Sequence, residues 1–177
     1  MHIDVFSDAG HKDSFFVSGA VLQIQDDYHL VTFPRVASSN LRTATIELRG
    51  IFNAVGMAIK MFPEITTMTI TCDNQSVIDC LAGRSTFKDD FKDKCVRRLL
   101  SILKRHNIEV LFVHKTQTEC SEIRMCDWIC KMAKSNNSSF LSNPCVPKGC
   151  KKFCSANHIV GHRHNFLKMS VDCENVL

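Results

Sequence analysis

Residues 15–36 read FFVSGAVLQIQDDYHLVTFPRV, and this stretch predicts a β-hairpin. Apolar and β-branched residues fill both halves, and the pair Asp26-Asp27 between them is typical of a tight turn. We therefore expect strands over 15–25 and 28–36. An apolar run at 3–6, followed by Asp8 and a small turn, predicts one strand before them. Three strands joined by short turns form an antiparallel meander.

The hydrophobic period changes after the meander. Leu48, Ile51, Val55 and Ile59 recur at three and four residues, which predicts an amphipathic helix over 42–62. The other expected elements are a strand at 66–72, helices at 74–81 and 87–105, a strand at 108–113 and a helix at 122–134. This order predicts an α/β domain with a five-stranded mixed sheet flanked by helices, in which three antiparallel strands are followed by two parallel strands.

The polar stretch 136–139 (NNSS) divides the chain. We expect a domain over 1–136 and a Cys/His-rich basic tail over 137–177, in which no sustained hydrophobic period predicts a regular element. Residues 135–177 hold five basic and two acidic side chains, so much of the net charge of +4 lies there.

Composition excludes several classes of protein. With 45% hydrophobic and 23% charged residues, the chain is neither disordered throughout nor fibrous. No apolar run approaches the ~18 residues of a membrane span, so we expect no membrane partner. Asp4 stands where a signal peptide carries positive charge, and the ten cysteines then indicate reduced thiols or metal ligands. We therefore expect a cytoplasmic or nuclear protein.

Acidic residues recur where elements meet. Asp8 and Asp73 each follow an apolar strand, Glu47 borders the apolar stripe of the long helix, and Asp127 lies on the inward side of the last helix. Ligands collect outside the carboxyl ends of strands in α/β sheets, and crowded carboxylates favour a hard cation such as Mg²⁺ or Mn²⁺. Each residue is also common as a turn, capping or surface residue, and spacing alone does not establish the combination.

Four segments carry a family resemblance. In chain order they are Phe6-Ser7-Asp8-Ala9-Gly10, Ile46-Glu47-Leu48, the stretch 70–78 (ITCDNQSVI) and Arg124-Met125-Cys126-Asp127. Together they resemble ribonuclease H of type 1 over about residues 1–135, and the order of expected elements is similar to the fold of that family.

The resemblance implies a metal-dependent endonuclease that hydrolyses the RNA strand of RNA–DNA hybrids. It implies that Asp8, Glu47, Asp73 and Asp127 hold two Mg²⁺ or Mn²⁺ ions per active site. The resemblance also implies that His114 is the family's mobile histidine, which assists product departure. His114 stands earlier than that histidine usually does, so a structural role at the end of the strand is the alternative. The residues implied in substrate contact are Asn74, Gln75, Thr43 and Thr45.

Two departures from the family keep other functions open. Residues 10–14 (GHKDS) replace a Gly-rich turn, and 41–45 (LRTAT) lack the usual asparagines. The first alternative is an inactive ribonuclease H-like module that binds nucleic acid or protein. The second is another nuclease of the same superfold, acting on DNA or structured RNA. The sequence does not indicate the oligomeric state.

The tail offers soft metal ligands. Tetrahedral Zn²⁺ takes four nitrogen or sulfur ligands, and a short segment can fold around it. The spacing matches no standard zinc finger, so a disordered basic tail is the alternative. The candidate ligands are Cys145, Cys150, Cys154, His158 and His162.

Overall fold

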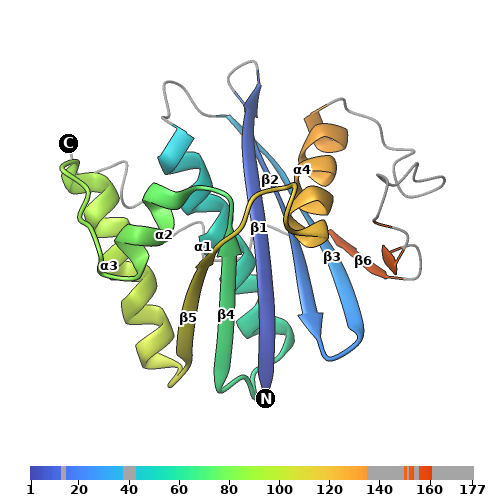
Figure 1. Cartoon of the computed structure of the whole chain (residues 1–177), viewed down its shortest axis with the longest axis horizontal. Helices are drawn as coiled ribbons and strands as arrows, with labels where there is room; N and C mark the ends of the chain where they lie inside the picture. The colour runs from blue at the N-terminus through green and yellow to red at the C-terminus, as the bar shows by residue number, and fades with distance from the viewer. Residues whose placement is uncertain (13–14, 38–42, 135–149, 151, 154–155, 161–177) are drawn as a thin grey trace.

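A mixed sheet of six strands forms the centre of the part of the chain that the structure describes (Figure 1). The structure is a computed structural model and describes residues 1–12, 15–37, 43–134, 150, 152–153 and 156–160. The strands are β1 (His2–Lys12), β2 (Phe15–Ile24), β3 (Asp27–Ala37), β4 (Thr67–Cys72), β5 (Glu109–His114) and β6 (Asn157–Val160). Their order across the sheet is β5-β4-β1-β2-β3-β6.

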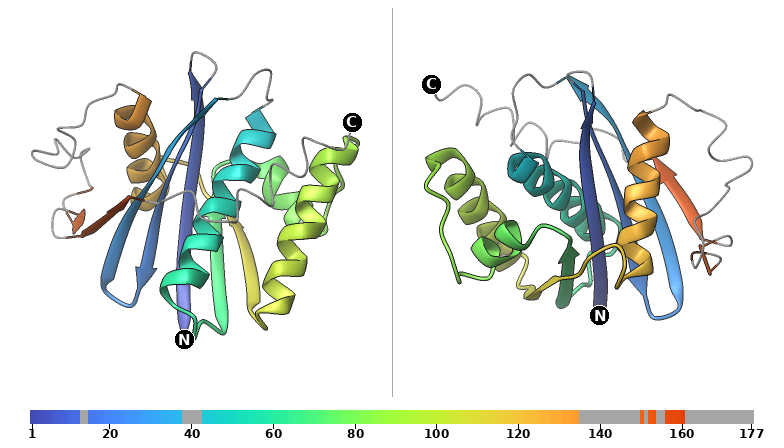
Figure 2. Two further views of the ribbon diagram at one scale, coloured as in Figure 1. Left: turned by 180° about the vertical axis from the view of Figure 1, so that it is seen from behind. Right: turned by 45° about the horizontal axis from the view of Figure 1, so that its top comes forward.

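Helices cover both faces of this sheet. They are α1 (Thr43–Met61), α2 (Gln75–Leu81), α3 (Asp90–Arg105) and α4 (Ser121–Lys134). Seen from behind, α1 and α3 lie in front of the sheet and α4 lies on its far side (Figure 2). α1 packs on β1 and β2, and α4 packs on β1, β2 and β3. Among the described residues, no helix combines the length and apolar character needed to cross a membrane.

The strand directions match the predicted fold class. β1, β2 and β3 form the antiparallel meander, with Ile24 opposite Asp27 across a two-residue turn. Gln25 in this turn has a φ of 53°, as a tight hairpin turn requires. β4 pairs with β1 and β5 pairs with β4, both in parallel. The predicted three antiparallel and two parallel strands are confirmed.

β1 is longer than the sequence predicts, and Asp8 lies within it. The expectation that the strand ends before Asp8 is wrong, because Ala9 and Gly10 continue the hairpin opposite Ser18 and Val17. The parallel pairing with β4 does end earlier, at Phe6 opposite Thr71. Asp8 therefore still lies near the carboxyl end of β4.

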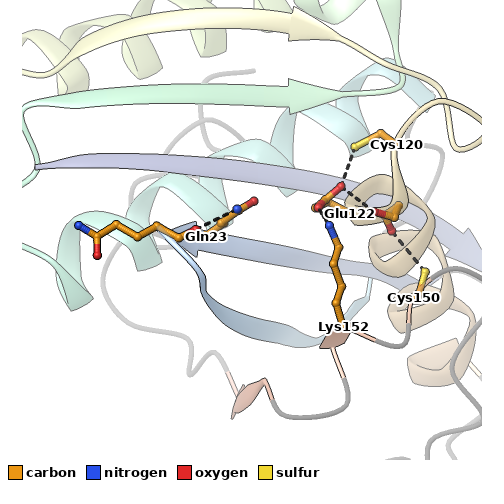
Figure 3. A network of polar contacts seen from close by, with 7 residues as sticks. Gln23, Cys120, Glu122, Cys150 and Lys152 are labelled. Atoms are coloured by element: carbon orange, nitrogen blue, oxygen red, sulfur yellow. Dashed lines mark hydrogen bonds and ion pairs between the residues drawn. The ribbon is translucent and has the colours of Figure 1, made fainter.

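Part of the tail belongs to the sheet. β6 pairs in parallel with β3, although residues 137–177 show no period that predicts a strand. Phe153 is buried and meets Tyr28 edge to face, with ring centroids 5.1 Å apart. Lys152 pairs with Glu122 of α4, and Cys150 Sγ lies 3.5 Å from the Ser121 carbonyl oxygen (Figure 3). A four-residue strand is too short for its alternation to be recognised in sequence.

Two apolar clusters hold the layers together. The larger lies between the sheet and α1, α2 and α3, and includes Ile51, Ile70 and Leu99. The smaller lies on the α4 face and joins Ile129 of α4 to Phe153 of the tail. The helices that carry Glu47 and Asp127 are thus fixed to opposite faces of the sheet.

Candidate functional site

Four carboxylates from four separate elements come within electrostatic reach of one another. Asp8 lies in β1, Glu47 in α1 and Asp127 in α4, and Asp73 directly follows β4. Burial raises the pKa of Glu47 to about 9, and the charges of Asp8 and Asp73 raise it further. Burial also raises the pKa of Asp73, and Asp127 adds to that effect. Charge interactions thus link Glu47 to both Asp8 and Asp73, and Asp73 to Asp127.

Glu47 and Asp73 form the tightest part of this group, together with Cys72. One ligand atom from each of these residues lies within 4.8 Å of the others. Among the described residues, Asp8 and Asp127 do not join a group as tight as this. The arrangement is thus a close pair of carboxylates beside a thiol, with two further carboxylates around it.

A glycine lets α1 bring Glu47 to the sheet. A Cβ atom on Gly50 would lie 2.9 Å from Ala9 Cβ, closer than real Cβ contacts, and 3.1 Å from Ser7 Oγ. The helix can therefore approach β1 only because position 50 has no side chain. Glu47, one turn earlier on α1, is consequently only 5% exposed.

A second glycine plays the same part on the opposite face. A Cβ atom on Gly19 of β2 would lie 2.6 Å from Cγ2 of Ile129 and 3.2 Å from the Cys126 carbonyl oxygen. The thiol of Cys126 donates to the Phe6 carbonyl oxygen at 3.4 Å, which also ties α4 to β1. α4, which carries Asp127, is therefore held close to β1, which carries Asp8.

Asp8 is fixed by its own backbone environment. Its side chain is only 7% exposed, and its Oδ1 accepts a hydrogen bond from the Ala9 backbone N–H at 2.9 Å. This contact fixes the orientation of one oxygen of the Asp8 carboxylate.

The turn after β4 orients Asp73. Asn74 caps α2, since its Oδ1 accepts a hydrogen bond from the Val77 backbone N–H at 3.2 Å. His114 Nε2 lies 3.1 Å from the Asp73 carbonyl oxygen. Hydrogen bonding from Gln117 and the nearby His114 oppose the rise in the pKa of Asp73 that burial causes. The position of Asp73 is thus set by the end of β4, the start of α2 and the loop after β5.

Asp127 has a cation of its own chain beside it. Lys131 Nζ lies 2.5 Å from Asp127 Oδ2, one helical turn along α4. The hydrogen bond to Asp127 raises the pKa of Lys131, and the charge of Asp8 contributes as well. A positive charge therefore already lies at the edge of the carboxylate group.

Two of the four residues expected to contact substrate, Asn74 and Gln75, have hydrogen-bond partners within the protein. Asn74 caps α2, and Gln75 Nε2 donates to Asp79 Oδ1 at 2.8 Å. Thr43 is exposed at the start of α1, and Thr45 is buried. Their role toward substrate stays a prediction.

The predicted zinc ligands fall mostly outside the described residues. Cys145, Cys154 and His162 lie there, and the side chain of His158 is not described either. Cys150 is buried in the apolar cluster under α4. A zinc site in the tail stays a prediction.

Sequence reasoning missed three residues that surround the carboxylates. They are Cys72, Gln117 and Lys131. Lys131 could have been found, because it stands four positions after Asp127 and so shares its helical face. Cys72 and Gln117 carry no such local signal, because their proximity depends on how β4, α1 and the loop after β5 pack together.

The donor set fits hard divalent cations. Oxygen ligands from several carboxylates are those that Mg²⁺ and Mn²⁺ take. A pKa near 9 for Glu47 means that its carboxylate is poorly compensated by the protein itself. A divalent cation would supply the missing positive charge between Glu47, Asp73 and Asp8.

Solved structures of ribonucleases H1 are similar to this chain. The RNase H1 of the halophilic archaeon Halobacterium salinarum NRC-1 superposes with a TM-score of 0.60 at 15% identity, over 76% of this chain and 98% of that one. The N-terminal RNase H domain of Rv2228c from Mycobacterium tuberculosis gives 0.56 at 15% identity, over 73% and 95%. LC11-RNase H1, solved with an RNA/DNA hybrid, gives 0.57 at 10% identity, over 75% and 99%.

Comparison by sequence adds nothing to this. No protein-family profile matches the chain, and no curated protein matches it. The likeness is therefore carried by the arrangement of the strands and helices. The chain has the ribonuclease H-like fold that the sequence resemblance predicts.

Proposed function

We propose that this protein is a metal-dependent endoribonuclease that hydrolyses the RNA strand of RNA–DNA hybrids. The observation that carries the proposal is the buried Glu47 carboxylate, which lies within 4.8 Å of a ligand atom of Asp73 and has its pKa raised by the charges of Asp8 and Asp73. Mutually repelling carboxylates are unfavourable in a fold unless one of them stays protonated or a cation neutralises them, and a divalent cation lets all of them ionise. The ribonuclease H-like fold supports the choice of reaction.

Asp8, Glu47, Asp73 and Asp127 are the residues that would hold the metal. Two divalent ions would supply the activation of a water molecule and the stabilisation of the leaving oxygen at phosphorus. The protein's own contribution is to orient the carboxylates: the Ala9 N–H fixes Asp8, and Gln117 and the His114 ring fix the Asp73 turn. His114, whose Nε2 lies 3.1 Å from the Asp73 carbonyl oxygen, would assist product departure.

The choice of hybrid as substrate is supported by a structural neighbour. LC11-RNase H1 has been solved with an RNA/DNA hybrid and shares the fold of this chain. The basic residues of α3 give weaker support, because Lys94 and Arg97 are paired with Asp90 and Asp93, each at 2.7 Å. Phosphate contacts need cations that are free to exchange their partners.

The ion pairs within α3, together with the pair between Lys131 and Asp127, favour a second candidate function. An internal cation can take the place of a metal beside Asp127. The protein would then be an inactive module that binds nucleic acid or protein.

A cleavage assay separates the candidates. A labelled RNA–DNA hybrid, duplex DNA and duplex RNA are incubated with the full chain in Mg²⁺ or Mn²⁺, and Asp73→Asn is compared with wild type. Asp26→Asn is the matched control, because Asp26 is exposed in the turn between β2 and β3, level with the start of β1 and far from Asp8.

Hybrid cleavage that Asp73→Asn abolishes and Asp26→Asn retains supports the proposal. Cleavage of duplex DNA or duplex RNA without cleavage of the hybrid would mean that the protein is another kind of nuclease with this superfold. Binding of the hybrid without cleavage, in both metals, assigns the inactive module.

A further inference from the structure

A thiol lies within the carboxylate group. Cys72 is the last residue of β4 and is fully buried. Its Sγ lies 3.9 Å from Glu47 Oε2, and it accepts a hydrogen bond from the Asn74 backbone N–H at 3.4 Å. The sulfur therefore faces Glu47, and the chain turns around it to place Asp73 on the same side.

The separations suit a single ion shared by sulfur and oxygen. The ligand atoms of Glu47, Cys72 and Asp73 all lie within 4.8 Å of one another. Sulfur and oxygen ligands of one tetrahedral Zn²⁺ lie about 3.6 Å apart, given the usual Zn–S and Zn–O bond lengths. The distance of 3.9 Å between Cys72 Sγ and Glu47 Oε2 is close to that value. Two carboxylates and one thiolate are donors that Zn²⁺ and its thiophilic relatives accept.

Sulfur changes which ions such a site prefers. Mg²⁺ and Mn²⁺ take oxygen ligands, whereas a thiolate selects softer ions such as Zn²⁺, Co²⁺ and Cd²⁺. A site made of carboxylates alone would hold these ions less firmly than one that adds sulfur.

We propose that Cys72 makes the carboxylate site a binding site for thiophilic divalent ions, held by the Cys72 sulfur together with Glu47 and Asp73. The ion takes the place of the protons on the Cys72 thiol and on the Glu47 carboxyl group, and both protons pass to solvent, so no oxidant or reductant is involved. Such an ion would occupy carboxylates that the proposed nuclease needs for Mg²⁺ or Mn²⁺, and would inhibit it. The predicted inhibition rests on the proposed function, whereas the predicted binding of the ion does not.

Cadmium titration tests the proposal on the full chain. Binding is followed by the ultraviolet absorption of sulfur-to-cadmium charge transfer, and wild type is compared with Cys72→Ser. Cys80→Ser is the matched control, since Cys80 is also buried but lies on α2, outside the tight group. The tail cysteines are present in all three proteins, so the difference between them isolates Cys72.

We expect wild type and Cys80→Ser to share a cadmium site that Cys72→Ser lacks, and Glu47→Gln to weaken that site at least about tenfold. Cadmium-113 NMR of wild type alone should show a resonance from mixed sulfur and oxygen ligands, so the test does not depend on folding of a variant. Identical titrations of wild type and folded Cys72→Ser would overturn the proposal. So would a Cys72-dependent site that Glu47→Gln leaves at full affinity.

The two proposals fail separately. Loss of the cadmium difference in a protein that cleaves the hybrid refutes only the role of Cys72. A protein that cleaves no substrate but binds cadmium through Cys72 and Glu47 refutes only the nuclease.

Discussion

The Cys130 thiol donates to the Asp8 backbone carbonyl oxygen at 3.3 Å, so α4 is fastened to β1 at one of the site carboxylates. Cys130 stands three positions after Asp127 on α4, and the two residues are joined through the helix. The distance between Asp8 and Asp127 is therefore set by how closely the helix lies on the sheet. The geometry of the site therefore depends on how α4 packs on the sheet.

Gly19→Ala should disturb that packing. The added methyl group would meet Ile129, whose Cγ2 lies 2.6 Å from the Cβ position, and would push α4 outward. We expect a loss of about 1–3 kcal/mol in the free energy of unfolding. Because Asp127 moves with the helix, hybrid cleavage should fall by about tenfold or more. Urea unfolding and the cleavage assay measure the two effects.

Gly83→Ala is the control for a glycine substitution away from the site. Gly83 has a φ of +71°, and no atom lies within 4 Å of its Cβ position. Backbone strain alone should lower stability by about 1 kcal/mol and leave cleavage unchanged. Equal losses of activity in both variants would mean that α4 packing does not position the site.

Glu47→Gln should remove a pH dependence of stability in metal-free protein. The pKa of Glu47 is about 9 in the folded state against 4.5 ordinarily, so the folded state holds the extra proton between these values. The stabilisation is complete below pH 4.5 and is lost as the pH rises toward 9. Between pH ~6 and ~8.5 the free energy of unfolding should fall by about 3 kcal/mol in wild type.

The measurement is urea unfolding in a chelator at the two pH values. Glu47→Gln keeps a neutral group of the same shape and should flatten this decline. Glu64→Gln, on an exposed side chain, should retain it. Parallel declines in wild type and Glu47→Gln would show that Glu47 is ionised at neutral pH.

Mg²⁺ or Mn²⁺ should stabilise the protein through the carboxylates. An ion at about one hundred times its Kd adds about 2.7 kcal/mol, which raises Tm by several degrees. The rise should be greater at pH ~8.5 than at ~6, because metal binding requires Glu47 to lose its proton. Thermal unfolding should show it in wild type and Asp26→Asn, and Asp73→Asn should lose most of it. A Tm that no divalent ion changes would contradict the metal site.

Phe153→Ala should destabilise the whole domain, although residue 153 lies in the expected tail. Phe153 is 1% exposed between Tyr28 and the α4 cluster, and truncating it leaves a cavity of aromatic size. We expect a loss of about 3–5 kcal/mol in the free energy of unfolding. Leu111→Ala, at a side chain 62% exposed on β5, should change it by less than about 0.5 kcal/mol. A tail that contributes nothing to the fold would give similar values for both.

Local periodicity was enough to predict the elements of the main domain. The alternation of β2 and β3 and the three-to-four spacing of Leu48, Ile51 and Val55 each report which side of an element is buried. The predicted ends of the helices and strands agree with the structure to within a few residues. β1 is the exception, because its hairpin with β2 extends the strand past Asp8. The four carboxylates could also be named, because each stands beside an apolar pattern that places it at an element's inner side or end.

Only the tertiary structure decided how near those groups come and what lies between them. The approach of α1 and α4 depends on Gly50 and Gly19 meeting Ala9 and Ile129, contacts between residues far apart in the chain. The raised pKa of Glu47, the entry of Cys72 into the site and the addition of β6 to the sheet follow from such contacts. A local sequence pattern indicates whether a residue is buried, but not which residues lie next to it across the sheet. These three features could therefore be found only in the tertiary structure.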